Sequence, residues 1–299
     1  MSFLSALRVA LAALLVNKSR SALTSLGIII GIAAVIGMVS AGDGARAKLD
    51  ERLDSVGKNL VVVRSGAHTT SGAVADTAPL TREDASAVRR ALGSSVEGVA
   101  EVQLTQRAAV AGTRHWMTLI SGTTPDMKPV RQWQVVAGRF LTEDDLKKQA
   151  QVCLVGQTVV QKLFPGHADL VGRTVRVDHL SLRIVGVLGS KGQSPTGADQ
   201  DDIIFVPLSS LQHKLVGEEK LSLLLTAPRA SLDPDAVKEQ ILKTLRAQHH
   251  SKVGSEDFDV STVSEMAELA VVVTATLRVL VGIIASISLV VGGIGIMNI

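Results

Sequence analysis

Two long stretches without a charged residue constrain this chain more than any other feature. Residues 21–42 and 279–299 contain no Asp, Glu, Lys or Arg over 22 and 21 positions. As a helix, each stretch would exceed the roughly 30 Å of a bilayer's hydrocarbon core. We therefore predict transmembrane helices at 21–42 and 279–299. A cleavable signal peptide is the alternative for the first stretch, since Val39-Ser40-Ala41 resembles a cleavage site, but the stretch is long and a second one follows.

The distribution of charge predicts how the chain is oriented. The first 20 residues carry Arg8, Lys18 and Arg20 and no acid, whereas the other 28 Lys and Arg and all 28 acids lie in 43–278. The positive-inside bias then places the N-terminus in the cytoplasm, with these three residues as interfacial anchors and 43–278 on the outer side of the membrane. Apolar residues at helical spacing predict an amphipathic elbow helix on the lipid surface over 1–20, although 10–16 could equally extend the first span.

The exterior segment has a mixed α/β pattern. We predict a strand at 59–64, then a helix at 81–92 that Thr81 opens with Asp84 as its capping-box partner. A strand at 220–226, a helix at 233–249 and a strand at 258–262 form a second β-α-β pattern. The two patterns bracket an insertion of about 112–215. The predicted fold is thus a membrane protein whose transmembrane α-helices flank a mixed α+β domain, 43–278, of two lobes.

No pattern in the sequence indicates catalysis, a cofactor site or a metal site. A G-x-x-x-x-G-K-[ST] loop for ATP phosphates is missing from the 299 residues, and no Ser, His and acid combine in a nucleophile motif. The basic excess is three residues before the first span, so we expect no nucleic-acid partner. Cys153 lies in an apolar strand and is predicted to be a buried, inert thiol.

Three polar clusters receive structural interpretations. The adjacent His249-His250 cannot form an i,i+4 ligand pair, and we expect them to be solvated residues at a helix end. Glu143-Asp144-Asp145 is expected at a helix start, where the helix dipole favours acids. Asp199-Gln200-Asp201-Asp202 could bind a cation, but a solvated loop is the preferred interpretation.

Small residues in the two predicted spans suggest helix packing. Gly27 and Gly31 form a GxxxG pair in the first span, and the second contains Ser288, Gly292 and Gly293. Small side chains let helix backbones approach closely in lipid, so these residues are candidate packing positions within the chain or in a dimer.

Several segments together resemble a known family. They are Asn17–Gly31, Trp133–Phe140, Ala150-Gln151-Val152, Leu163-Phe164-Pro165, Val171-Gly172-Arg173, Val185-Gly186-Val187 and Ile287–Ile299. On these residues the chain resembles the permease of MacB-type ABC transporters, which are related to lipoprotein-releasing permeases and FtsX. The resemblance covers essentially the whole chain.

The resemblance implies a permease that moves a substrate out of the cell without catalysing a reaction. The family has a porter-like periplasmic lobe with an inserted second lobe, and it dimerises, as a homodimer or paired permease. A cytoplasmic ABC ATPase, which holds ATP and Mg, drives it by mechanotransmission. Exporting members work with a periplasmic MacA-like adaptor and an outer-membrane TolC-like channel. Because Met1 begins at the elbow helix and the chain stops in the second of four family spans, we expect a separate ATPase chain and a truncated permease.

Two other functions remain open from the sequence. An FtsX-like regulator would signal the state of the ATPase to an extracytoplasmic cell-wall hydrolase and export nothing. A membrane-tethered sensor would bind a ligand through its exterior domain. No residue pattern names a transported substrate.

Overall fold

The computed structural model describes residues 59–66, 79–167, 169–194, 197–229, 232–250 and 257–265. It also describes scattered helical positions at 26, 29–33, 36–40, 44, 279–280, 282–284, 286–287 and 290. The chain divides into two compact units, Glu51–Ala267 and a unit made of Met1–Asp50 with Glu268–Ile299. Within the described residues, no helix combines the length and the apolar character needed to cross a membrane. The two transmembrane helices therefore stay predictions.

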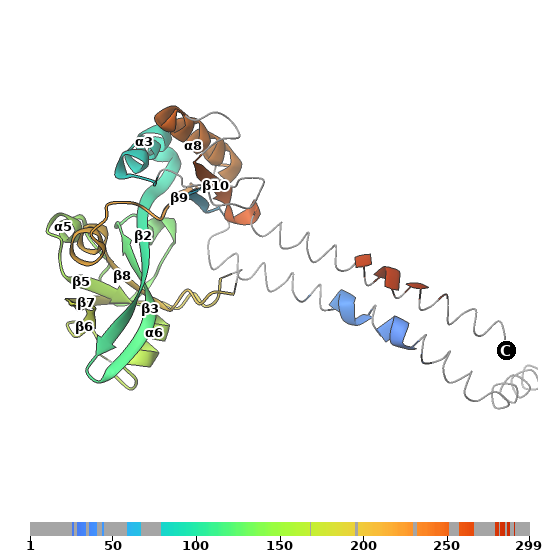
Figure 1. Cartoon of the computed structure of the whole chain (residues 1–299), viewed down its shortest axis with the longest axis horizontal. Coiled ribbons are helices and arrows are strands. Elements are labelled where there is room, and N and C mark those ends of the chain that lie inside the picture. The colour runs from blue at the N-terminus through green and yellow to red at the C-terminus, as the bar shows by residue number, and fades with distance from the viewer. Residues whose placement is uncertain are drawn as a thin grey trace, which may run out of the picture. The chain divides into compact units, whose positions relative to one another are not determined.

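The unit Glu51–Ala267 is built on one ten-stranded mixed sheet with the strand order β10-β1-β9-β2-β3-β8-β5-β7-β4, and β6 pairs with β2 and β7 (Figure 1). Strand β2, Val96–Ala111, runs through both halves of the sheet. Its first half pairs with β9, Leu223–Pro228, and its second half pairs with β3, Arg114–Thr123. Two separate hydrophobic cores form along it, and they define a first and a second lobe.

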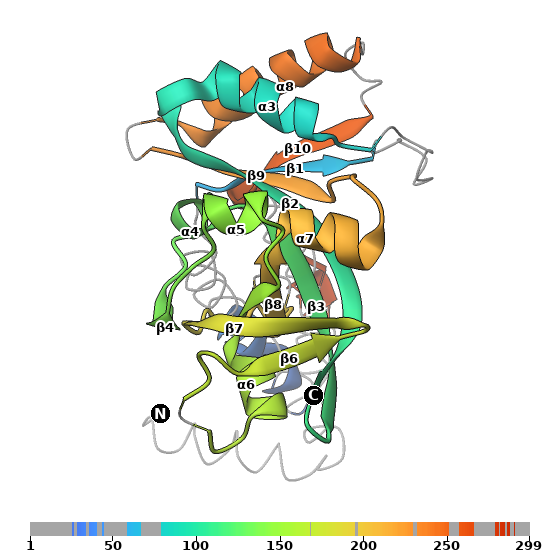
Figure 2. The ribbon, with the colours of Figure 1, turned by 90° about the vertical axis from the view of Figure 1, so that its left-hand side faces the viewer.

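The first lobe consists of two interleaved β-α-β units. One is β1 (Val61–Ser65), α3 (Arg82–Leu92), the short helix η1 (Gly93–Ser95) and β2; the other is β9, α8 (Pro234–His249) and β10 (Phe258–Thr262). Strand β1 pairs antiparallel with both β10 and β9, so each unit encloses a strand of the other. Helices α3 and α8 pack side by side over the sheet (Figure 2). Their apolar faces and the strands enclose the first core, which includes Val63, Val88, Leu224, Ile241 and Leu245.

Local capping explains where the two helices of this lobe begin. The Thr81 hydroxyl accepts the Asp84 backbone N–H at 3.3 Å, and an Asp84 carboxylate oxygen accepts the Thr81 N–H at 2.9 Å. This confirms the capping box that the sequence predicts. In α8, the Asp233 side chain caps the first turn and Pro234 occupies its first position, also as predicted.

In the sequence, the residues of the second lobe lie between β2 and β9 of the first lobe. Its strands are β3, β4 (Val135–Gly138), β5 (Val152–Val155), β6 (Thr174–Val177), β7 (Leu180–Leu188) and β8 (Ile203–Pro207). The helices are α4 (Met127–Val130), α5 (Glu143–Lys147), α6 (Gln157–Leu163), α7 (Leu208–Leu211) and the π-helical η2 (Gln212–Val216). Strand β8 pairs parallel with β3, and β5 pairs parallel with β7. Cys153, Val155, Leu182 and Ile184 are fully buried in the second core.

The mixed α/β content is confirmed, and the differences from prediction are local. Strands β6 and β7 form an antiparallel hairpin. Residues 96–111 form one continuous strand, β2. Helices α4 and α7, together with β4, were not anticipated, because segments of four residues carry too little periodicity to predict. The domain boundaries 43–278 and 112–215 stay predictions.

Candidate functional site

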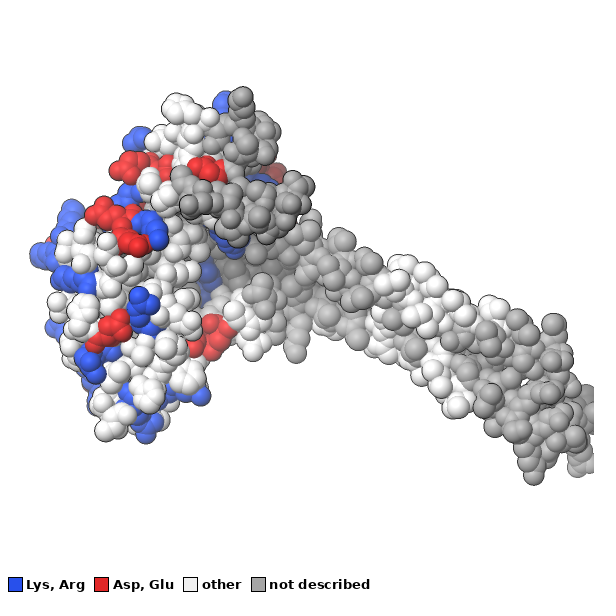
Figure 3. All heavy atoms as spheres, viewed as in Figure 1, with Lys and Arg blue, Asp and Glu red and all other residues white. Residues whose placement is uncertain are grey.

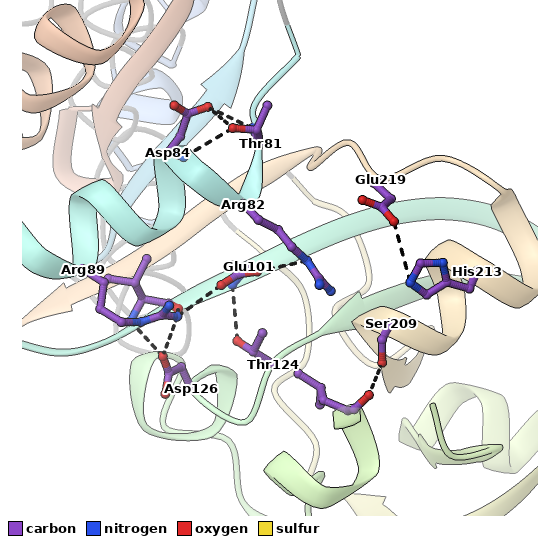
Figure 4. Close-up of polar contacts among 12 residues, drawn as sticks. Thr81, Arg82, Asp84, Arg89, Glu101, Thr124, Asp126, Ser209, His213 and Glu219 are labelled. Atoms are coloured by element: carbon purple, nitrogen blue, oxygen red, sulfur yellow. Dashed lines mark hydrogen bonds and ion pairs between the residues drawn. The ribbon is translucent and has the colours of Figure 1, made fainter. Parts of the chain in front are cut away.

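A charged cleft of about 460 Å³ lies where the two lobes meet. Helix α3 and strand β2 provide one wall, and the segment after β3 with helices α5 and α7 provides the other. Figure 4 shows how the charged side chains of α3, β2 and α4 converge at this place. The lining residues are Arg82, Ser86, Arg89, Glu101, Thr124, Asp126, Glu143, Leu146, Lys147 and Ser209. We call this the interlobe cleft.

Arg89, in the last turn of α3, joins the walls of the cleft. Its Nη2 donates to the Val99 carbonyl oxygen at 2.8 Å and to Glu101 Oε1 and Asp126 Oδ2, each at 3.3 Å. The same Asp126 oxygen accepts the Val99 backbone N–H at 3.2 Å, and the Glu101 N–H donates to Thr124 Oγ1 at 3.4 Å. A single guanidinium thus connects the helix of the first lobe to the segment that follows β3.

Glu101 lies at the base of the cleft and is 8% exposed. Burial raises the pKa of its carboxyl above the ordinary value, although the positive charges of Arg89 and Arg82 act in the opposite direction. Arg82 approaches from α3, with its Nε 3.7 Å from Glu101 Oε2. That Nε is buried and has no hydrogen-bond partner within the described part of the chain. A buried N–H without an acceptor is costly, whereas the Arg82 side chain as a whole is 41% exposed.

Helix α5 contributes the opposite charged side chains. Its position is set by Thr142 and Asp145, which form a second capping box, and by Arg139, whose two terminal nitrogens bind the Asp145 oxygens at 2.6 and 3.0 Å. The Arg139 hydrogen bonds hold the pKa of Asp145 below its ordinary value. The acid cluster Glu143-Asp144-Asp145 therefore lies at a helix start, as predicted. This arrangement directs Glu143 and Lys147 to the cleft.

The cleft is suited to binding charged groups. It contains three cationic and three acidic side chains, but no His or Cys. Elsewhere in the described residues, no three His, Cys, Asp or Glu side chains come together as a metal site.

The sequence analysis did not predict the cleft, although two features of the sequence indicated it. Arg82 and Arg89 share a helix face seven residues apart, and Glu101 interrupts an apolar strand.

The residues that we predict to pack or to anchor the membrane helices lie almost entirely outside the described residues. Gly31 is described, and it is helical and buried. The remaining packing candidates, Gly27, Ser288, Gly292 and Gly293, are not among the described residues, and neither are the anchors Arg8, Lys18 and Arg20. Their roles stay predictions.

The structure corrects the prediction that His249 is solvated. The His249 side chain is 11% exposed and lies between two carboxylates, with Nε2 3.0 Å from Asp84 Oδ1 and Nδ1 2.9 Å from Asp257 Oδ2. Its neighbour His250 is exposed, at the left-handed C-cap of α8. The sequence did not show this because the two acids come from the start of α3 and the residue before β10.

The acidic loop 199–202 is less solvated than predicted, because two of its carboxylates accept hydrogen bonds within the second lobe. Asp201 is buried and accepts hydrogen bonds from the Ser190 hydroxyl and from the backbone N–H groups of Lys191 and Gly192. Asp202 Oδ1 accepts from Trp116 Nε1 at 2.9 Å and from Thr118 Oγ1 at 2.7 Å. These two carboxylates hold the loop to the second lobe, so Asp201 and Asp202 are not simply solvated.

Cys153 is fully buried, as predicted, and burial raises the pKa of its thiol far above the ordinary range. On the face shown in Figure 3, basic and acidic side chains are interspersed, in keeping with the neutral charge sum of 43–278.

The resemblance segments that lie within the second lobe have a structural role there. Gly138 has φ +78°, and a Cβ there would lie 2.1 Å from the Val185 carbonyl oxygen. Gly186 pairs with Gly138 across the β4–β7 ladder, and a Cβ at Gly186 would lie 2.4 Å from the Arg139 carbonyl oxygen. Trp133 and Phe140 pack edge-on against Phe205. These motifs therefore specify this lobe's fold, and none of these residues lines the interlobe cleft.

A family model described as the MacB-like periplasmic core domain matches residues 21–244. The chain belongs to this family. Among curated relatives, a macrolide export ATP-binding/permease protein MacB of Azoarcus sp. (strain BH72) is 38% identical over 98% of the chain. The protein of the same name from Rhodospirillum rubrum is 36% identical over the full chain. The chain spans less than half of these relatives, 44% and 45% of their lengths.

Solved structures support the same fold. The periplasmic region of MacB from Actinobacillus actinomycetemcomitans superposes with a TM-score of 0.61 at 19% identity and covers 75% of this chain and 97% of that one. The extracellular domain of the noncanonic ABC-type transporter YknZ from Gram-positive bacteria gives a TM-score of 0.55 at 16% identity, covering 68% and 100%. At these identities the similarity concerns the fold alone.

Proposed function

We propose that this chain is permease sequence of an ATP-driven ABC transporter of the MacB type, which exports a substrate. The observation that carries the proposal is the alignment to macrolide export ATP-binding/permease proteins over 98% of the chain, which includes both uncharged stretches as well as the domain between them. A relationship confined to the exterior domain would support only a shared fold. The names of these relatives make a macrolide the first substrate to test.

The membrane arrangement that we propose is two helices, 21–42 and 279–299, with the N-terminus in the cytoplasm and 43–278 outside the inner membrane. Described helical positions in both stretches expose large aliphatic side chains, between 47% and 63% of each. They are Leu26, Ile29, Ile30, Ile32, Ile36 and Val39, and Val279, Leu280, Ile283, Ile284, Ile287 and Val290. Such apolar surface is costly in water and suits contact with lipid.

In this arrangement, ATP hydrolysis takes place outside these 299 residues, which contain no phosphate-binding loop. A cytoplasmic ABC ATPase would move the helices, and the helices would move the exterior lobes. A second permease copy, a MacA-like adaptor and a TolC-like channel complete the proposed assembly. The chain itself performs no chemistry, since its described charged cleft holds no nucleophile paired with a base.

The test is assembly with an ATPase. The permease that contains these residues is expected to co-purify with an ABC ATPase from membranes, and the ATPase rate in lipid is expected to depend on both. As a control, replacing 21–42 by an unrelated apolar helix of equal length should leave membrane insertion intact and lower the stimulated rate. An ATPase whose rate and membrane retention are unaffected by the permease would contradict the proposal.

The FtsX-like regulator is the weaker alternative, because the curated relatives described above carry names of exporters rather than of regulators. It predicts that the exterior domain binds a cell-wall hydrolase or its activator. Loss of substrate export without any cell-separation defect, on deletion of the gene, would favour the exporter.

A further inference from the structure

Two positive side chains in the interlobe cleft form no hydrogen bond with the described residues. Lys147 of α5 forms no ion pair or hydrogen bond through its side chain with any described residue, whereas its neighbour Lys148 pairs with Asp144 at 2.6 Å. Arg82 of α3 has a single ionic contact, 3.7 Å from Nε to Glu101, and no hydrogen bond within the described residues. Figure 4 shows its terminal nitrogens lying beyond that contact. The two cations come from opposite walls of one cleft.

The other charges of the cleft are mostly satisfied by one another. Arg89 bonds to both Glu101 and Asp126, and Asp126 also accepts a backbone N–H. Because Arg89 faces two acids, the six charges of the cleft sum to zero, and Arg82 and Lys147 are its two cations that form no hydrogen bond with the described residues. Solvated surface charges need no explanation, but Arg82 presents a buried N–H without an acceptor, and buried donors are normally satisfied.

We propose that the interlobe cleft binds a small molecule through a carboxylate group, which lies between the Arg82 guanidinium and the Lys147 ammonium. The inference concerns ligand binding and goes beyond the transport function proposed above. A bound carboxylate would accept hydrogen bonds from the terminal nitrogens of Arg82 and would connect α3 of the first lobe to α5 of the second. The hydroxyls of Ser86 and Thr124 and the apolar side chain of Leu146 line the rest of the cleft.

The size and charge of the cleft narrow the class of ligand. Its volume of about 460 Å³ falls within the range of roughly 300–1,000 Å³ of small-molecule sites. A carboxylate would place one negative charge between the two cations, whereas a phosphate dianion would place two near Glu143 at the rim and Glu101 at the base. A monocarboxylate is therefore favoured over phosphate, and an uncharged molecule of the same shape would leave both cations unpaired.

The test measures the binding of N-acetylglycine, as the probe, to the full chain in lipid nanodiscs by ligand-observed NMR. Saturable binding is expected, and Arg82→Gln and Lys147→Gln are each expected to weaken it at least about fivefold, the loss of one charged hydrogen bond. Lys147→Arg should retain binding. The matched controls Arg90→Gln and Lys148→Gln change exposed cations of the same two helices that do not line the cleft, and they should bind like the parent.

Two comparison probes test which chemical group the cleft recognises. The neutral N-acetylglycinamide should bind much more weakly than N-acetylglycine, and inorganic phosphate should displace N-acetylglycine only at a higher concentration. Equal binding of the amide, tighter binding of phosphate, or N-acetylglycine binding that is unchanged in both cleft variants would overturn the proposal. So would the absence of any saturable binding to a chain whose circular dichroism shows that it is folded.

Discussion

At the scale of single residues, glycine positions show most directly how this sequence specifies its second lobe. Gly138 and Gly172 both have left-handed backbone angles, with φ of +78° and +91°. A Cβ at Gly138 would collide with the Val185 carbonyl oxygen, which already accepts the Arg139 N–H at 2.9 Å. A Cβ at Gly172 would meet nothing within 4 Å. The two positions therefore separate the cost of the backbone angle from the cost of a close approach.

This difference predicts the outcome of two alanine substitutions. Gly172→Ala should lower the free energy of unfolding by about 1–2 kcal/mol, the cost of a left-handed alanine. Gly138→Ala should cost at least about 2 kcal/mol more, because the β4–β7 ladder must separate to admit the methyl group. Urea unfolding followed by the fluorescence of Trp116 and Trp133 would measure both. Equal costs would show that no close approach occurs at Gly138.

Residue patterns predicted some of these roles and missed others for a physical reason. The cap residues Thr81 and Asp84 were predictable because both ends of the interaction lie within one helical turn. The contact of Arg89 with Asp126 joins residues 37 positions apart, and nothing in the local sequence encodes it. Glu101 could be recognised as unusual in its strand, but its partners could not be named.

At the scale of elements, His249 holds three parts of the first lobe together. Its two ring nitrogens face Asp84 at the start of α3 and Asp257 before β10, and its ring packs edge-on against Phe258. Both carboxylates accept hydrogen bonds, but a neutral imidazole has only one N–H to donate. The geometry therefore requires the imidazolium. Burial alone would lower the pKa of His249, but the Asp257 hydrogen bond and the charge of Asp84 raise it above 6.5.

This arrangement predicts a stability that depends on pH. Because the pKa of His249 is raised in the folded state, its contribution is fully present below about pH 6.5 and is lost as the pH rises through the folded pKa. His249→Gln should therefore destabilise the chain by about 2 kcal/mol under acidic conditions and by much less above the folded pKa. Circular dichroism melts at about pH 5.5 and pH 8.5 would measure the difference. The matched control, His250→Gln at the exposed cap, should show no such dependence.

At the scale of the whole molecule, the uncharged stretches and the three basic residues ahead of the first one predict topology, because insertion depends on the charge and apolarity of contiguous segments. The order of strands in the sheet was only partly accessible. The two β-α-β patterns were visible in the sequence, but the pairing of β2 with β9 joins residues more than a hundred positions apart. The interlobe cleft is likewise lined by residues as far apart as Arg82 and Ser209, which is why it emerges only from the folded chain.

The proposed topology gives a last prediction, which uses thiol chemistry. The native Cys153 is fully buried, so a membrane-impermeant maleimide should not label the parent chain in intact spheroplasts. Ser181 is exposed on β7, and Ser181→Cys should be labelled there, because we place 43–278 outside the cytoplasm. Ser5→Cys, ahead of the first uncharged stretch, should be labelled only after the membrane is permeabilised. Labelling of the Ser5→Cys chain and protection of the Ser181→Cys chain in intact spheroplasts would reverse the orientation, and with it the side of the membrane on which the interlobe cleft could meet a ligand.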